Sequence, residues 1–300
     1  MDEKKAFGVG PAGIEMAYES FGDPGAPPVL LVMGGGAQMI NWPDGFCAEL
    51  AGRGVHVTRF DNRDAGRSTH FHDAPAPDVQ AALAGDFSSA SYTLSDMAAD
   101  TVGLLDVLGI GSAHFVGASL GGMVAQMVAI EHPGRVRSLT SMMSSTGDPA
   151  VGRADFGALG ELGPQPEDRH GSIDWQVRAI RAIGSPGFPF DEAAVAERAA
   201  LAYDRGHDRL AMARQAVATL ATGDRTERLR SLDVPTLVVH GSDDIMCDVS
   251  GGRATAAAVP GAELVVIDGL GHGFPRGAWS RLTSLIADHV HRTEAAPSGS

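Results

Sequence analysis

Residues 114–130 read HFVGASLGGMVAQMVAI, and this stretch decides how the chain is expected to fold. An apolar, strand-like run reaches Gly117, Ser119 follows, and an apolar, helix-like run begins after Gly121 and Gly122. A G-x-S-x-G pattern between a strand and a helix is typical of a nucleophile elbow, whose strained turn lifts the serine side chain clear of the backbone. The residues two before and two after the serine approach each other closely, so both must be small. The stretch therefore predicts Ser119 as a nucleophile.

A serine nucleophile needs a base and an acid, and later loops offer candidates for both. The hydroxyl is a weak nucleophile until a base takes its proton. His272 is the candidate base, because it stands among glycines in the segment GLGHGFP, directly after a strand-like run. The acid that orients this base is Asp244 by the spacing H-G-x-x-D, with Asp243 as a close second. All three members of this catalytic triad follow separate predicted strands, at the edge where open α/β sheets hold ligands.

The oxyanion hole of an acyl-transfer enzyme needs two N–H donors. The amide of Leu120, directly after the candidate nucleophile, is the first. The second is expected from the GGGAQM loop at residues 34–39, where we favour Gly35 because glycine lets the backbone approach a substrate. As a dinucleotide fingerprint the loop fails, because Met39 stands where G-x-G-x-x-G requires a third glycine. No organic cofactor is expected.

Strand-like runs alternate with helix-like segments along most of the 300 residues. This alternation predicts an α/β fold, with a mostly parallel eight-stranded sheet and helices on both faces. An N-terminal hairpin near residues 6–9 and 14–21 is the expected antiparallel exception. Between 146 and 231 only helix-like segments occur. The chain is therefore expected to divide into a core, residues 1–145 and 232–300, and a helical cap, residues 146–231.

Composition and charge exclude several classes of partner. The formal net charge is −14, with 37 acidic against 23 basic residues, so nucleic acid and anionic membranes are disfavoured. Two widely separated cysteines, Cys47 and Cys247, form neither a disulfide framework nor a zinc motif. There is no apolar leader and no run of about 18 apolar residues, so a cytoplasmic location is expected. A small-molecule substrate is the expected partner, and the oligomeric state is left open.

Two loop segments invite a binding interpretation that we do not favour. His70 and His72 form an H-x-H pair, but no further ligands cluster nearby in the sequence, so no metal site is expected. In the segment FDNRDAGRS, Arg63 could bind substrate. We favour instead local ion pairs among Asp61, Arg63 and Asp64, which would hold the loop that follows a strand.

The motifs VMGGG, FDNRDAGRS, GASLGG, HGSDD and GLGHGFP stand in the order of the α/β-hydrolase superfamily, which the chain resembles over nearly its whole length. More narrowly, it resembles actinobacterial carboxylesterases of the anthracycline (aclacinomycin) methylesterase type. These share the LLVMGG loop, an N-W-P-like segment at residues 41–43 and the pattern R-x-D-x-R-D-x-G-R-S at residues 59–68. Met33 departs from many superfamily members, which have histidine before the oxyanion glycine. The resemblance implies a serine esterase that cleaves a carboxylic ester, such as the methyl ester of a polyketide-like acid.

Other activities would use the same residues. An enol-lactonase or a C–C bond hydrolase needs the same triad, and a ligand-binding member of the superfamily would use the pocket without turnover. A proline near the oxyanion loop would favour a haloperoxidase-like perhydrolase, and GGGAQM has none. Large apolar side chains are the candidates for the substrate pocket, and we select Trp42, Met123, Trp175, Met246 and Phe274.

Overall fold

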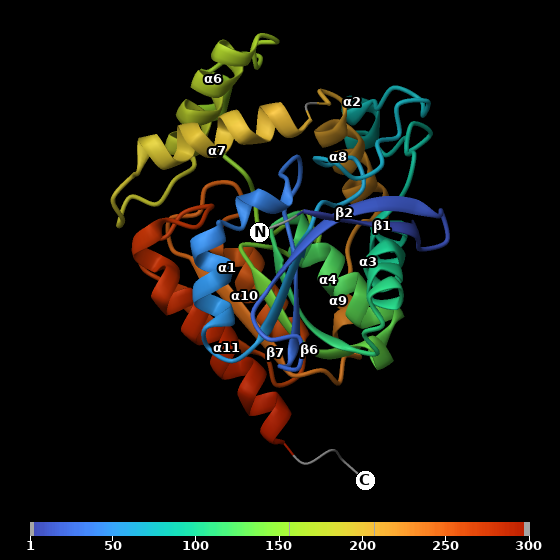
Figure 1. Ribbon diagram of the computed structural model, residues 1–300. Coiled ribbons are helices and arrows are strands. Elements are labelled where there is room, and N and C mark those ends of the chain that lie inside the picture. Colours follow the sequence, from blue (N-terminus) through green and yellow to red (C-terminus); the bar gives the residue numbers. More distant parts are fainter. Residues whose placement is uncertain (1–2, 156, 207, 297–300) are drawn as a thin grey trace.

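The chain forms a central sheet with helices on both sides (Figure 1). The computed structural model describes residues 3–155, 157–206 and 208–296. The eight-stranded sheet has the order β1-β2-β4-β3-β5-β6-β7-β8. The strands are β1 (Lys4–Val9), β2 (Ile14–Phe21), β3 (Pro28–Val32), β4 (His56–Phe60), β5 (Ala113–Ala118), β6 (Val136–Met142), β7 (Thr236–Gly241) and β8 (Glu263–Ile267).

Helices fill most of the connections between the strands. They are α1 (Asp44–Ala51), α2 (Val79–Leu83), α3 (Leu94–Leu108), α4 (Leu120–Glu131), α5 (Gly157–Gly160), α6 (Arg169–Ala182), α7 (Glu192–Arg205), α8 (Ala211–Thr222), α9 (Thr226–Leu229), α10 (Val249–Ala258) and α11 (Trp279–Ala295). Short 3-10 turns are η1 (Met39–Asn41), η2 (Pro133–Arg135) and η3 (Arg276–Ala278). Within the part of the chain that the structure describes, no helix combines the length and the apolar character needed to cross a membrane.

The strand directions match the alternation of the sequence. β1 and β2 form an antiparallel hairpin, and β2 also runs antiparallel to β4. All other neighbouring pairs are parallel. The predicted mostly parallel sheet and its N-terminal hairpin are therefore confirmed. Because the strands from β3 to β8 run the same way, the loops after β3, β5, β7 and β8 all leave from one edge of the sheet.

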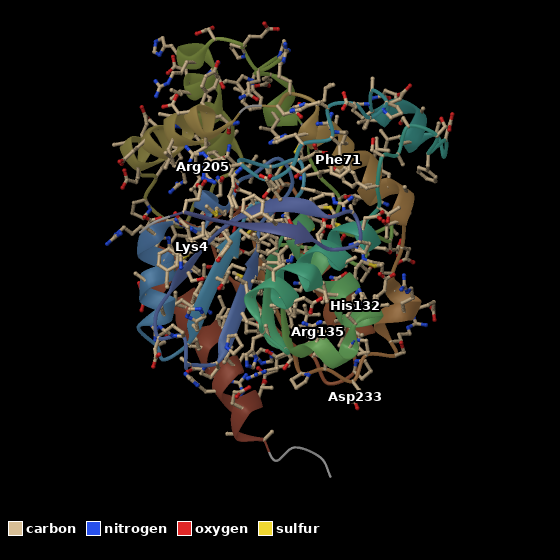
Figure 2. All side chains as sticks on the ribbon, turned by 45° about the vertical axis from the view of Figure 1, so that its right-hand side comes forward. Lys4, Phe71, His132, Arg135, Arg205 and Asp233 are labelled. Atoms are coloured by element: carbon tan, nitrogen blue, oxygen red, sulfur yellow. The ribbon has the colours of Figure 1, made fainter. Side chains whose placement is uncertain are left out.

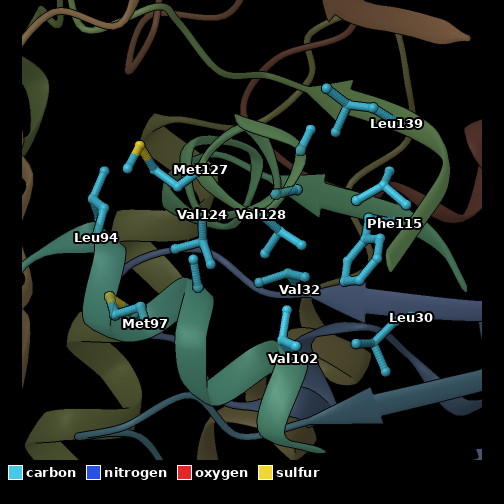
Figure 3. Close-up of a cluster of buried hydrophobic side chains, with 14 of the residues drawn as sticks. Leu30, Val32, Leu94, Met97, Val102, Phe115, Val124, Met127, Val128 and Leu139 are labelled. Carbon is cyan, nitrogen blue, oxygen red and sulfur yellow. The ribbon is translucent and has the colours of Figure 1, made fainter. Parts of the chain in front are cut away.

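Alternate residues of the central strands enter two separate cores. In β3, Leu30 and Val32 face one core and Leu31 faces the other. The first core packs β3 and β5 against α3 and α4, through side chains such as Val124 (Figure 3). The second packs the opposite face against α1 and α11, through side chains such as Phe46. Burying one such side chain contributes about 1.5–3 kcal/mol, so both faces hold the sheet rigidly beneath its loops.

Between β6 and β7 the described residues form helices α5 to α9 and no strand. In Figure 1, α6 and α7 lie beyond one end of the sheet, apart from α1, α3, α4 and α11 on its sides. The segment is helical, as predicted. The cap boundaries at residues 146 and 231 stay a prediction.

Buried arginines of α7 and α8 tie this segment to the loop after β4. Arg205 Nη2 lies 2.5 Å from Asp61 Oδ2, and Arg214 bonds both oxygens of Asp64 at 2.9 Å. None of these four side chains is more than 3% exposed. Figure 2 shows Arg205 where α7 meets the core. The helical segment is therefore joined to the sheet by charge pairs that water does not reach.

The expectation of local ion pairs within residues 61–64 is wrong. Arg63 Nε lies 2.6 Å from Asp100 Oδ2 of α3, and its guanidinium sits over the rings of Phe71 and Tyr92 at 5.1 and 4.9 Å. The acids on either side of Arg63 pair with arginines of α7 and α8. Each charge finds a partner far along the chain, because helices distant in sequence pack directly on this loop. Arg63 is a buried structural residue, as favoured, but its partner lies on another element.

Candidate active site

Ser119 lies at a strained turn between the end of β5 and the start of α4. Its backbone angles are φ 55° and ψ −123°, and it is one of three described residues other than glycine with positive φ. Such a conformation costs about 1–3 kcal/mol and persists only where the surroundings hold it. Here the Ser119 N–H donates to Met142 O at 2.9 Å, and Ser144 Oγ donates to Ser119 O at 2.8 Å. The turn is thus held on both sides by the end of β6.

The glycines around this turn leave no room for a side chain. A Cβ on Gly117 would lie 2.1 Å from Gly121 O, and a Cβ on Gly121 would lie 2.1 Å from Val32 O. Both obstacles are backbone atoms, so they cannot rotate aside. A Cβ on Gly122 would lie 2.7 Å from Ser144 Cβ. The predicted need for small residues two before and two after Ser119 is confirmed.

Loops after β7 and β8 bring Asp244 and His272 together. His272 Nδ1 lies 2.9 Å from Asp244 Oδ1 and 2.8 Å from Oδ2. The Asp244 side chain is fully buried, and its Oδ1 also accepts hydrogen bonds from the N–H groups of Met246 and Cys247 at 2.9 Å each. A carboxylate held in this way keeps the proton of a neutral imidazole on Nδ1 and leaves Nε2 to accept another.

Asp243, the alternative acid, bonds other groups. Its Oδ2 accepts from the Gly269 N–H at 3.1 Å and from the neighbouring serine hydroxyl, and the residue is exposed. His240, which begins the H-G-x-x-D spacing, is buried and donates from Nε2 to Cys247 O at 2.6 Å. Burial lowers the pKa of His240, so it stays neutral inside the protein. The spacing therefore selects the aspartate that contacts His272, beside a structural histidine.

The helical segment holds the loop that carries His272. The His272 N–H donates to Ile183 O at 3.0 Å, and the Gly271 N–H donates to Ser185 Oγ at 2.9 Å. Both acceptors lie just after α6. The position of the candidate base therefore depends on the segment between α6 and α7 as well as on β8.

The two segments that carry the predicted oxyanion donors meet at Ser119. Leu120 is the first residue of α4, so its N–H has no acceptor within its own helix. The loop after β3 approaches closely, since a Cβ on Gly34 would lie 3.1 Å from Ser119 Cβ and one on Gly35 would lie 3.7 Å from Leu120 Cδ2. Among the residues described, Gly35 N–H has no hydrogen-bond partner. The loop that carries Gly35 thus lies against Ser119 and Leu120, and the role of Gly35 and Leu120 as oxyanion donors stays a prediction.

The N–H of Gly36, the next residue in this loop, already has a hydrogen-bond partner. The Gly36 N–H donates to Gln215 Oε1 at 2.8 Å, and Gln215 Nε2 donates to Arg63 O at 2.9 Å. Gln215 lies on α8, so the helical segment also bridges the loops after β3 and β4. This contact was not visible in the sequence, because its partners stand 179 and 152 positions away.

A cavity of about 560 Å³ includes His272 in its wall. It lies between the α6–α7 region and the loops after β7 and β8, a size and place suited to a small molecule. Its lining is largely apolar with a few charges, and includes Phe190, Ala194, Val195, Arg198, Phe274 and Trp279. Sequence reasoning missed Arg198. One feature of the sequence could have indicated that Arg198 lines the cavity. It is a single cation, at helical spacing from Ala194 and Val195, in a stretch of α7 that is otherwise rich in alanine.

The five predicted pocket residues lie in different places. Phe274 lines the cavity, and Trp42 backs it from the core with ring centroids 4.4 Å apart. Met123 lies on α4 and packs against the first core, and Met246 donates its N–H to the buried Asp244. Trp175 lies on α6 and donates its indole N–H to a loop carbonyl at 2.9 Å. A binding role for these residues stays a prediction.

In the structure, the carboxylate of Asp208 lies close to the imidazoles of His70 and His72. His70, His72 and Asp208 place one ligand atom each within 4.8 Å of one another, and the two imidazoles stack with centroids 5.3 Å apart. These atoms could hold a metal ion. However, Arg214 already pairs with the Asp208 carboxylate, and His70 Nε2 bonds Gly66 O at 3.0 Å. The cluster is therefore explained as part of the ion-pair network between α8 and the loop after β4.

Comparison with known proteins agrees with this architecture. Residues 27–275 match the family model described as alpha/beta hydrolase fold. Rhodomycin D methylesterase of Streptomyces peucetius is 27% identical over 292 residues, which cover 91% of this chain and 93% of the relative. A non-heme chloroperoxidase of Kitasatospora aureofaciens is 27% identical over 271 residues, which cover 87% and 90%. The resemblance drawn from the motifs is confirmed.

Solved structures show the same fold. The enol-lactonase from Burkholderia xenovorans LB400 superposes with a TM-score of 0.70 at 21% identity, covering 96% of this chain and 100% of that one. The esterase RhEst1 from Rhodococcus sp. ECU1013 gives a TM-score of 0.70 at 23% identity, with 96% and 99% covered. Proteins with different reactions thus share this architecture, so the reaction has to be argued from the site.

Proposed function

Because the chain belongs to the alpha/beta hydrolase fold family, we propose that it is a serine hydrolase that cleaves a carboxylic ester. The observation that carries the proposal is the pair of contacts from His272 Nδ1 to the Asp244 carboxylate, which leave Nε2 as the basic nitrogen. The strained turn at Ser119 supports it, since a strained backbone at a predicted nucleophile is typical of this fold.

The first half-reaction forms an acyl-enzyme. Ser119 Oγ attacks the ester carbonyl carbon while His272 Nε2 takes the hydroxyl proton, and the Asp244 carboxylate stabilises the imidazolium. The carbonyl π electrons move to oxygen, and the N–H groups of Gly35 and Leu120 hold this oxyanion. Preorganised donors of this kind are worth about 3–4 kcal/mol each in the transition state. Collapse of the intermediate breaks the C–O bond, and His272 gives its proton to the leaving alcohol.

The second half-reaction releases the acid. A water gives its proton to His272 Nε2 and attacks the acyl carbon, and the same oxyanion donors hold the second tetrahedral intermediate. Its collapse returns the proton to Ser119 Oγ and frees the carboxylic acid. These steps use only groups of this chain and one water molecule.

We infer a small-molecule ester of a hydrophobic acid as the substrate class, with a methyl ester as the first candidate. The aromatic and aliphatic side chains of the cavity support the hydrophobic part. The methyl ester rests on the similarity to rhodomycin D methylesterase.

Labelling tests the mechanism directly. A fluorophosphonate should label the wild type at Ser119, and Ser119→Ala should lose both the label and the hydrolysis of p-nitrophenyl butyrate. The two thiols will not compete for the probe, because burial raises the pKa of Cys47 and of Cys247 to about 12. Full hydrolysis by the alanine variant would refute the mechanism. A panel of methyl esters, enol-lactones and β-diketones with mass-spectrometric product detection then separates esterase from lactonase or C–C hydrolase activity.

A further inference from the structure

Arg198 is a charged residue in the cavity wall that bonds no other described side chain. It lies in the middle of α7, one turn beyond Ala194 and Val195, which line the same wall. No hydrogen bond or ion pair joins its guanidinium to any other residue that the structure describes. The side chain is half-buried, and burial lowers the pKa of the guanidinium while Asp191 and Glu197 oppose this effect.

The buried arginines elsewhere in this chain have partners. Arg63, Arg205 and Arg214 each pair with a buried carboxylate. Arg225 donates to the side chain of Gln126 and to two backbone carbonyls. A guanidinium that is withdrawn from water gains most from a planar oxyanion that accepts two parallel hydrogen bonds. Arg198 differs from these arginines because no described residue of the protein accepts a hydrogen bond from its guanidinium.

The other two arginines of the cavity wall each contact an aromatic ring. Arg181 pairs with Glu192 and lies over the Phe190 ring at 4.1 Å, and Arg276 lies over the Trp279 ring at 4.8 Å.

The two acids of the cavity wall, Asp191 and Asp243, accept hydrogen bonds from backbone N–H groups and do not bond Arg198. The Asp191 carboxylate caps α7 by accepting from the Ala194 N–H at 3.1 Å. Asp243 accepts from the Gly269 N–H at 3.1 Å. Arg198 therefore makes no hydrogen bond or ion pair with these groups, and it lines the same cavity as His272.

We propose that Arg198 forms an anion subsite, and that the substrate of this site is an ester that also carries an ionised carboxylate. The inference rests on the proposed function for the position of the ester, which lies at Ser119 and His272. The carboxylate binds Arg198 across the cavity through two N–H donors, and the aromatic wall takes the chain between the two groups. The net charge of −14 does not prevent this, since charges on the surface more than about 10 Å away are screened by salt.

Paired substrates test the subsite. The monomethyl esters from succinate to suberate carry the carboxylate, and the dimethyl esters of the same acids are neutral controls. For at least one chain length, kcat/KM of the wild type should be about tenfold or more higher for the monoester. Arg198→Leu should raise KM much more for the monoester than for the dimethyl ester and so bring their ratio of kcat/KM close to one, whereas Arg198→Lys should keep part of the preference. O-acetyl hydroxy acids, which carry the carboxylate on the alcohol side, tell which half of the ester faces Arg198.

Arg178→Leu is the matched control. Arg178 lies on α6, is exposed and does not line the cavity, so its loss changes the net charge equally without touching the subsite. This variant should keep the preference for the monoester. Loss of the preference in both variants would assign the effect to general electrostatics and overturn the proposal.

Binding without turnover separates this inference from the proposed function. Isothermal titration of the Ser119→Ala variant with the monomethyl esters should show binding that the Ser119→Ala, Arg198→Leu double variant lacks. Ester hydrolysis with no preference for the monoester, together with no difference between the two titrations, would overturn the anion subsite and leave the esterase proposal standing. If the monomethyl esters bind through Arg198 but ester hydrolysis does not depend on Ser119, the anion subsite stands and the esterase mechanism is overturned.

Discussion

The N–H of His272 donates to the carbonyl oxygen of Ile183 at 3.0 Å, so the segment after α6 holds the loop of the candidate base. The contact is close, because a Cβ on the neighbouring Gly271 would lie 2.0 Å from Gly184 O. Helix α7, which carries Arg198, follows the same segment. The helical insertion therefore both bounds the cavity beside His272 and holds the loop that carries the imidazole.

Two glycines that flank His272 test this dependence. Gly271→Ala should push the loop away from Gly184, lower kcat about tenfold or more and destabilise the fold by about 1–3 kcal/mol. Gly273→Ala is the matched control, because nothing lies within 4 Å of its added Cβ. Steady-state kinetics and urea unfolding of both variants check the prediction. Equal effects from the two alanines would show that the contact with the α6 segment does not position the base.

Replacement by asparagine should affect the activity differently at the two adjacent aspartates, Asp243 and Asp244. Asp244→Asn places an amide where His272 Nδ1 now meets a carboxylate, so the proton can move to Nε2 and the base is lost. We expect kcat to fall about a thousandfold or more with little change in KM. Asp243→Asn, whose side chain bonds Gly269, should retain activity close to that of the wild type. A strong loss in Asp243→Asn alone would reverse the assignment.

Loss of Arg205 should destabilise the junction between α7 and the core. Arg205→Met leaves the carboxylate of Asp61, which is 0% exposed, without its cation, at an expected cost of about 3–5 kcal/mol in the free energy of unfolding. Arg169→Met is the control, since Arg169 also pairs with an aspartate, Asp204, but in an exposed position. Its unfolding midpoint in urea should not move. A midpoint for Arg205→Met equal to that of the wild type would show that the pair contributes nothing.

A buried histidine should make the fold sensitive to acid. Burial lowers the pKa of His114 from 6.5 to about 4, against the opposing effect of Glu294. Between these values the unfolded chain binds more protons than the folded one, so the free energy of unfolding falls as the pH drops from about 6.5 to about 4. His114→Asn should reduce this dependence, and His170→Asn, whose side chain is 89% exposed, should not. Urea midpoints across this pH range measure it, and parallel slopes for both variants and the wild type would contradict the assignment.

The parts of the site that the sequence predicted are those in which one local motif carries the information. Strand, elbow and helix around Ser119 are contiguous, so apolar runs and glycine spacing sufficed. Asp244 and His272 could be found because each follows directly after a strand, and parallel strands bring such loops to one edge. The hydrogen bond between them agrees with that expectation.

The interactions that sequence reasoning missed join positions far apart in the chain. The sequence favours ion pairs of Asp61 and Asp64 with Arg63, yet the two aspartates pair with Arg205 and Arg214, about 150 positions later. A charge in a loop has many possible partners, and only the packing of α7 and α8 on this loop selects among them. The lining of the cavity could not be read from the sequence for the same reason, since adjacency to a predicted catalytic loop does not say which side chains face a cavity.

By itself the sequence determined the mostly parallel sheet, the strained turn at Ser119, and the candidates Asp244 and His272, because periodicity and glycine spacing act within a few residues of each other. Tertiary structure alone decided which arginines meet the acids of the loop after β4, and which side chains, Arg198 among them, line the cavity beside His272. These outcomes depend on how the helical insertion docks on the sheet. That docking is the sum of many buried contacts between distant residues, and no local pattern in the chain encodes it.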